Sequence, residues 1–213
     1  ELTWFNAEAG EFSRQEPEGL RLTIPDTRIH PWGGIGFRTS FDFGGDFEIT
    51  AAFEILQADP PARGNGVGLV LHVAGPGGGA GLGRLTRSGN SEVLLWDHSG
   101  DGPLEQAPPG VEGTVPCLDR VGRMRLKRVE TTLFYQWSPT LEGGAFEEVH
   151  QLEFGDGPVD RVRLAGVTGR QPCNLDVLLL DLSIRSQTSE LAAPTASASS
   201  RSSWRLVVAS GLA

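Results

Sequence analysis

The chain has few cysteines, and it lacks the patterns of long helices. Its 213 residues include only two cysteines, Cys117 and Cys173, and no C-x-x-C pair, so the ligand set of a structural zinc site is missing. These cysteines allow either one disulfide or two separate thiols. Hydrophobic residues make up 38% of the chain, enough for one core but too little for a membrane bundle. We find no window of helical length in which apolar residues recur every 3.6 positions.

Basic residues are also scarce. The chain has 18 Lys and Arg against 27 Asp and Glu, which gives a formal net charge of −9. An acidic surface repels phosphate groups, so nucleic acid is not expected as a partner. The same repulsion argues against binding of the folded surface to anionic lipid.

Turn-forming residues and alternating patterns are abundant instead. The 29 Gly and 14 Pro interrupt long helices and suit short strands joined by turns. Apolar and polar residues alternate over residues 47–56 and 67–73, as in strands with one buried face. Residues 174–185 are apolar on both faces in their middle, as in a covered central strand. Further strands are expected at residues 20–24, 35–41, 83–86, 91–96, 121–129, 133–137, 146–152 and 161–167.

These short strands and their Gly-, Pro- and Asp-rich turns predict an all-β fold of two antiparallel sheets, which we place at residues 1–185. Residues 186–203 are rich in Ser, Ala and Thr, the composition of a flexible linker. Residues 204–213 turn apolar but are too few to span a bilayer. Trp204 and Arg205 are typical of a membrane interface, so this segment is either the start of a truncated membrane anchor or a frayed tail. The side of the membrane stays open.

One predicted hairpin separates core from surface. With Glu130 and Thr131 at its tip, Leu126 pairs with Tyr135 and Met124 with Trp137. These four apolar and aromatic residues share one face, which we expect in the core. The opposite face carries Arg125, Lys127, Phe134 and Gln136.

Several segments, in this order, resemble a known family. They are G-D-F-E-I-T at 45–50, G-V-G-L-V-L at 66–71, M-R-L-K-R-V at 124–129, L-F-Y at 133–135 and L-D-V-L-L-L-D-L at 175–182. Their order resembles the concanavalin-like (laminin-G-like) jelly-roll superfamily and, within it, an uncharacterised bacterial family, a domain of unknown function. The resemblance covers residues 20–185 and implies a two-sheet antiparallel jelly roll. Members of the superfamily include lectins, carbohydrate-binding modules and glycosidases, so it implies sugar recognition.

No local catalytic motif accompanies this pattern. Glycoside hydrolysis needs two carboxylates at one bond. Glu48 and Glu54 lie about 20 Å apart along a strand, whereas Glu147 and Glu148 are adjacent and face opposite sides. None of the four histidines lies in a nucleophile motif. The glycine-rich segment 75–81 lacks the Gly-Lys-Ser/Thr of a phosphate loop and is predicted to be a flexible loop.

Candidate ligand-binding residues combine aromatic rings for the CH faces of a sugar with polar groups for its hydroxyls. They are Trp32 in a turn, Trp96 and His98 at a strand end, and Arg125, Phe134 and Gln136 on the polar face of the hairpin. For each of them, a place in the core or on ordinary surface is the alternative.

A calcium site is a second candidate. Asp97, Ser99 and Asp101 place oxygen atoms at alternate positions, as in the first half of a calcium loop. Pro108 stands where that loop needs a bidentate Glu, so a polar hairpin turn is the alternative. No other cofactor is expected.

The sequence thus favours a non-catalytic binding domain over an enzyme, with carbohydrate or glycan as the ligand. One alternative is a protein-interaction or structural domain of a membrane-tethered protein, in which only the C-terminal segment, if its apolar run continues, contacts the membrane. Another is a glycoside-active hydrolase whose carboxylates come from different strands.

Overall fold

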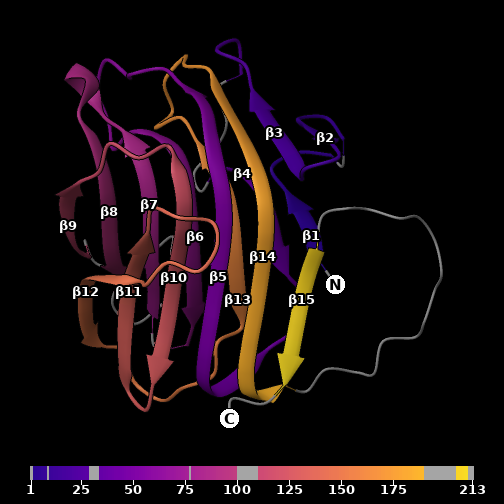
Figure 1. The fold of residues 1–213 in the computed structure, drawn as a ribbon, viewed down its shortest axis with the longest axis vertical. Helices are drawn as coiled ribbons and strands as arrows, with labels where there is room; N and C mark the ends of the chain where they lie inside the picture. Colours follow the sequence, from indigo (N-terminus) through magenta and orange to yellow (C-terminus); the bar gives the residue numbers. More distant parts are fainter. Residues whose placement is uncertain are drawn as a thin grey trace.

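The structure, a computed structural model, describes residues 2–8, 10–28, 34–76, 78–99, 110–189 and 205–210. These residues form two sheets that pack face to face, with one short 3-10 helix (η1, Ser88–Asn90) between strands (Figure 1). The strand pairs are antiparallel except for β14 with β15. The predicted all-β jelly roll of two antiparallel sheets is therefore confirmed.

Seven strands form one sheet. Their order is β1 (Leu2–Phe5), β4 (Ile35–Thr39), β13 (Arg161–Val167), β6 (Val67–Gly75), β7 (Gly78–Thr86), β8 (Glu92–Ser99) and β9 (Val111–Pro116). The eight-stranded sheet has the order β12 (Glu147–Glu153), β11 (Thr132–Ser138), β10 (Val121–Val129), β5 (Phe43–Ala58), β14 (Leu175–Ser189), β3 (Leu20–Ile24) and β2 (Ser13–Gln15), with β15 (Arg205–Ser210) beside β14. Strands β5 and β14 are the longest and pair along most of their length (Figure 1).

The core lies between the sheets and follows from period-2 alternation. Phe47, Ile49, Ala51 and Phe53 of β5 are fully buried, while Glu48 and Thr50 between them are only partly buried and face outward. In the predicted hairpin Leu126 pairs with Tyr135, and both side chains are buried as expected. The burial of such apolar side chains, each worth about 1.5–3 kcal/mol, supplies the main driving force for folding.

Two buried arginines hydrogen-bond to the backbone of neighbouring loops. Arg128 of β10 donates to the carbonyl oxygens of Gly45 at 3.0 Å and Gly157 at 2.6 Å. Arg84 of β7 donates to the carbonyl of Asp119 at 2.7 Å and pairs with Glu92. Because these guanidinium groups satisfy backbone or carboxylate oxygens inside the protein, we assign them a structural role.

The glycine-rich segment differs from its prediction. Within the predicted loop 75–81, residues 78–81 belong to strand β7, which continues through the predicted strand 83–86, and all nine residues of β7 are buried. The glycines remove side chains so that neighbouring strands can cover β7. A Cβ atom at Gly79 would lie 2.8 Å from Cε1 of His72, and one at Gly81 would lie 2.7 Å from Oδ2 of Asp97.

The C-terminal part extends the eight-stranded sheet. Strand β14 ends at Ser189, beyond the predicted boundary at residue 185. Arg205–Ser210 then forms β15, which runs parallel to β14 at Asp181–Ser186. The segment predicted to begin an apolar anchor is thus, where it is described, a strand. The predicted linker lies largely outside the described residues. Within the described ranges, no helix is long and apolar enough to cross a membrane.

The two cysteines do not form the disulfide that the sequence allowed. Cys117 and Cys173 are both buried free thiols. Cys117 lies 3.9 Å from the carbonyl oxygen of Asp119, whereas Cys173 lies near the carboxylates of Asp59 and Asp26. Burial raises the pKa of both thiols, so each is held in its less reactive neutral form.

Candidate functional site

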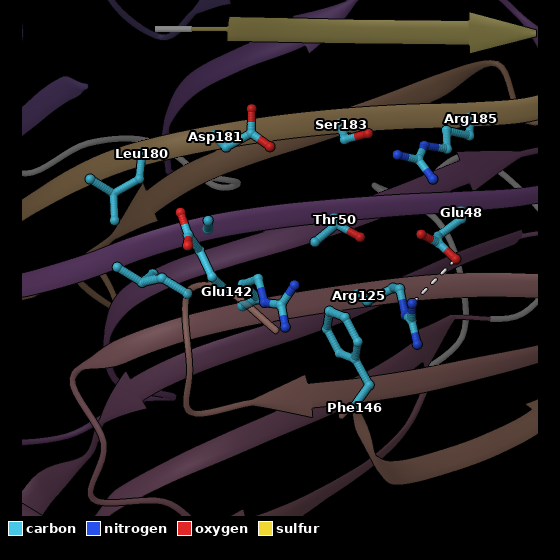
Figure 2. A pocket seen from close by; sticks show the side chains of 12 residues that line it. Glu48, Thr50, Arg125, Glu142, Phe146, Leu180, Asp181, Ser183 and Arg185 are labelled. Atoms are coloured by element: carbon cyan, nitrogen blue, oxygen red, sulfur yellow. Dashed lines mark hydrogen bonds and ion pairs between the residues drawn. The ribbon is translucent and has the colours of Figure 1, made fainter. Parts of the chain in front are cut away.

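The eight-stranded sheet carries a groove of about 620 Å³ on its outer face (Figure 2). Its floor comes from alternate residues of β5, β10 and β14, among them Thr50, Arg125 and Ser183, and Phe146 lies at its side. Its size lies within the range of small-molecule sites. Of the residues predicted to bind a ligand, Arg125 lines the groove and Gln136 contacts Arg125.

The polar side chains of this groove already bind one another. Arg125 donates to Oε1 of Gln136 at 2.7 Å and to Oε2 of Glu48 at 3.2 Å. Its guanidinium carbon also lies 3.6 Å from the ring centre of Phe146. Arg123 donates to the carbonyl of Gly144 at 2.8 Å. A ligand here must break or share contacts that the protein already makes.

On the outer face of the seven-stranded sheet, several polar side chains lack hydrogen-bond partners among the described residues. Strand register places one residue from each of six strands side by side, in the order Arg38, Arg163, His72, Gly81, Asp97 and Glu112. We call this line the polar row. Its residues come from positions far apart in the sequence, and alternation turns all of them away from the core.

His72 is the most unusual member of the polar row. Its side chain is 7% exposed, and neither ring nitrogen has a hydrogen-bond partner. Burial, followed by the nearby Arg163 and Arg161, lowers the pKa of His72 to about 3, so its imidazole is neutral. A buried polar group without a partner is rare, because it loses its bonds to water without replacement.

Arg163 beside His72, and Asp97 on the far side of Gly81, also lack side-chain partners among the described residues. The described residues provide no hydrogen-bond or ion-pair partner for the guanidinium of Arg163 or the carboxylate of Asp97. Burial, and then repulsion by Glu112, raises the pKa of Asp97 to about 6, although Arg163 acts in the other direction. Burial lowers the pKa of Arg163, and Arg161 lowers it further. Three groups of the polar row thus have unused hydrogen-bonding capacity.

The same face has an apolar half beside the polar row. Leu85, Val93 and Leu95 form a buried cluster, and Val70 and Val167 pack against it. At the other edge the ring centre of Phe5 lies 5.8 Å from the guanidinium carbon of Arg163. The face can therefore offer hydrogen bonds and apolar contacts to one ligand.

The structure separates the residues predicted to bind a ligand. Trp96 turns toward the space between the sheets, where it stacks on His150 at 3.6 Å between ring centres. His98 turns the same way, 6.2 Å from the ring of Phe154. Phe134 lies on the outer face of the hairpin, paired with Lys127, and does not line the groove. Trp32 lies outside the described residues.

The calcium prediction stays untested. Asp97 and Ser99 lie on the outer face of β8, and Asp101 lies outside the described residues. In the part of the chain that the structure describes, no group of three or more His, Cys, Asp and Glu side chains could hold a metal ion.

Sequence reasoning missed His72 and Arg163 as site residues. Arg161 and Arg163 alternate with Val162 and Leu164, a pattern that puts both arginines on one outer face. The sequence alone could therefore have placed Arg163 on an outer face. The pairing of β13 with β6, which brings Arg163 opposite His72, depends on a register that no local pattern specifies.

Comparison with solved structures defines the class of fold. The structure is similar to a functionally unknown protein from Saccharomyces cerevisiae, with a TM-score of 0.59, 15% identity, and coverage of 90% of this chain and 97% of that one. It is also similar to a legume lectin-like domain from Entamoeba histolytica (TM-score 0.54, 10% identity, 87% and 89% covered). An alginate lyase from Klebsiella pneumoniae gives a TM-score of 0.53 at 9% identity, with 88% and 84% covered. At these identities the likeness shows a shared jelly-roll fold.

Comparison with family models identifies the chain more closely than the fold does. A family model described as the C domain of a protein of unknown function (DUF1583) matches residues 1–203, so the chain belongs to that family. The predicted domain of unknown function is confirmed at this level. No curated protein matches the chain.

Proposed function

We propose that this domain binds a saccharide on the outer face of the seven-stranded sheet, over the polar row. The observation that carries the proposal is the unused bonding capacity of Arg163, His72 and Asp97, which lie in one row with only Gly81 between His72 and Asp97. Desolvated groups without partners are costly in an empty protein and become favourable when a ligand pairs with them.

The chemistry of the face suits a sugar. Each sugar hydroxyl both donates and accepts hydrogen bonds. The carboxylate of Asp97 accepts and the guanidinium of Arg163 donates, while the neutral imidazole of His72 has one donor and one acceptor that are buried and have no partner. Phe5 and the apolar cluster around Leu85 supply surface for the CH groups of a sugar ring. The lectin-like fold of a similar structure is consistent with this choice.

The groove of Figure 2 is the weaker candidate despite its volume. Arg125 already bonds to Gln136 and Glu48, so a ligand gains little by replacing those bonds. We choose between the two faces by whether their polar side chains already have hydrogen-bond partners, and not by the volume of the groove.

Glycan-array screening followed by calorimetry tests the proposal. We expect a saccharide to bind the wild-type protein and His72→Leu to weaken that binding at least tenfold. His72→Leu should fold normally and be as stable as the wild type or more so, because it removes two unpaired buried nitrogens. Arg125→Gln in the groove is the matched control and should bind like the wild type. Absence of binding to any glycan at high protein concentration, or loss of binding only in Arg125→Gln, contradicts the proposal.

One observation favours glycoside hydrolysis as a second candidate. Asp97 and Glu112 are cross-strand neighbours on the outer face of β8 and β9, and Cβ atoms in such pairs lie about 5 Å apart. From such positions two carboxyl groups can approach to the separation of about 5 Å that a retaining glycosidase uses. A pKa of about 6 at Asp97 suits a general acid. Release of reducing ends from a bound glycan, abolished in both Asp97→Asn and Glu112→Gln, would support hydrolysis. A bound glycan that stays intact over days would reject it.

A further inference from the structure

Three arginines gather on one edge of the same outer face. Arg163 of β13 lies directly opposite Arg38 of β4, and Arg161 lies two residues along β13 on the same side. Like charges that face each other across strands destabilise a sheet. The mutual effect is evident at Arg163, whose pKa is lowered by burial and then by Arg161, with a further contribution from Arg38.

The described acidic side chains offset this cluster only in part, through an ion pair of Asp160 with Arg161 and the more distant attraction of Asp97 for Arg163. The chain has 27 Asp and Glu against 18 Lys and Arg, so acidic partners are abundant elsewhere. Among the described residues, only Asp160 reaches ion-pair distance of any of the three, at 3.9 Å from Arg161 on exposed surface. A cluster of three arginines with one exposed carboxylate at ion-pair distance among the described residues indicates a place for an external anion.

A second observation points to a ligand at the same place. His72 is the register partner of Arg163 on β6, and its two buried nitrogens have no partner. Since its imidazole is neutral, it adds no further positive charge beside the arginines, and its buried donor and acceptor are not used by any described residue. The arginine cluster and the unpartnered histidine are therefore adjacent parts of one surface.

We propose that the saccharide bound by this domain carries an acidic group, a carboxylate or a sulfate ester, and that Arg38, Arg161 and Arg163 bind that group. The inference rests on the proposed saccharide function and names the class of sugar. Guanidinium groups pair with both kinds of oxyanion through parallel hydrogen bonds.

The polar row also sets the orientation of the ligand. Asp97 and Glu112 occupy the opposite end of the row from Arg38 and Arg163. Their negative charges repel an acidic group, so the acid points toward β13 and β4. Neutral hydroxyls of the sugar then lie toward Asp97, which can accept hydrogen bonds from them.

The test compares matched probes by calorimetry at low ionic strength. Hexuronate trimers are titrated against their methyl esters, and sulfated galactose oligomers against their desulfated forms. We expect one acidic probe to bind about 10–100-fold more tightly than its neutral counterpart, as charge-assisted hydrogen bonds predict. The difference should shrink in 1 M salt, because exposed charges are screened. Whichever pair shows the preference identifies the carboxylate or the sulfate ester.

Variants locate the effect and separate the two proposals. Arg38→Gln combined with Arg163→Gln should remove the preference for the acidic probe while binding of the neutral probe persists. Arg185→Gln, on the other sheet, is the matched control and should keep the preference. If neutral and acidic probes bind equally, or if only Arg185→Gln loses the preference, the acidic-ligand inference is overturned and saccharide binding stands. If no probe of either kind binds, both proposals are overturned.

Discussion

The carboxylate of Asp97 is largely buried, and the described residues provide it with no hydrogen bond or ion pair. Burial and Glu112 raise its pKa from the ordinary 3.8 to about 6. Proton binding by a carboxyl of raised pKa stabilises the folded state below pH 3.8, and that contribution is lost as the pH rises through about 6. At pH 7.5 the ionised carboxylate therefore costs the folded protein about 2–3 kcal/mol.

The substitution Asp97→Asn removes that charge and keeps the shape of the side chain. We expect Asp97→Asn to gain about 2–3 kcal/mol over the wild type in urea unfolding at pH 7.5, and to lose most of that advantage at pH 4. Comparing the two proteins at each pH cancels the titration of all other groups. Asp42→Asn, at an exposed carboxylate, is the control and should change stability little at either pH.

Either of two results would refute this reasoning. One is an Asp97→Asn protein that is less stable than the wild type at pH 7.5, since the carboxylate would then have a favourable partner. The other is a stability difference that does not change between pH 4 and pH 7.5, since the charge would then be irrelevant.

Three further predictions concern binding and packing. An acidic saccharide should bind several-fold more tightly at pH 5 than at pH 7.5, because protonation of Asp97 removes a negative charge that repels the acid. His72 stays neutral at both pH values, and Glu112 faces Asp97 at both. Calorimetry should find this pH dependence lost in Asp97→Asn. Arg128→Met should lower the free energy of unfolding in urea by about 3–5 kcal/mol, because it leaves backbone carbonyl oxygens inside the protein without a donor. A loss below 1 kcal/mol contradicts the structural role of Arg128. Gly113→Ala would place a Cβ atom 2.4 Å from Cζ2 of Trp96, so a loss of about 1–3 kcal/mol and altered tryptophan fluorescence are expected, and unchanged values would place Trp96 elsewhere.

Alternation was sufficient to predict most of the fold. Alternation predicted which side chains of β5 point into the core. Together with the two-residue turn, it predicted the pairing of Leu126 with Tyr135. Strands without alternation were missed, because β2 has only three residues and β9 is largely exposed. The glycine-rich start of β7 was misassigned as a loop, because the side chains that cover it come from β6 and β8 and are invisible in its own sequence.

The candidate site was predicted less well, because it depends on register. Arg163, His72 and Asp97 lie more than 20 positions apart in the sequence, and each is unremarkable in its own strand. Only the pairing of β13 with β6, and of β6 with β8 through β7, makes them neighbours. Trp96 was chosen for its ring, but an aromatic side chain at a strand end can equally turn inward, as it does here.

The most direct test of the account is to map which face of the sandwich meets a saccharide, by backbone amide chemical shifts during titration with a hexuronate trimer. We predict the largest changes in β13, β6 and β8, around Arg163, His72 and Asp97. Changes centred instead on β5, β10 and β14 around Arg125, or no change at millimolar saccharide, would contradict the central claim that the polar row is the binding site.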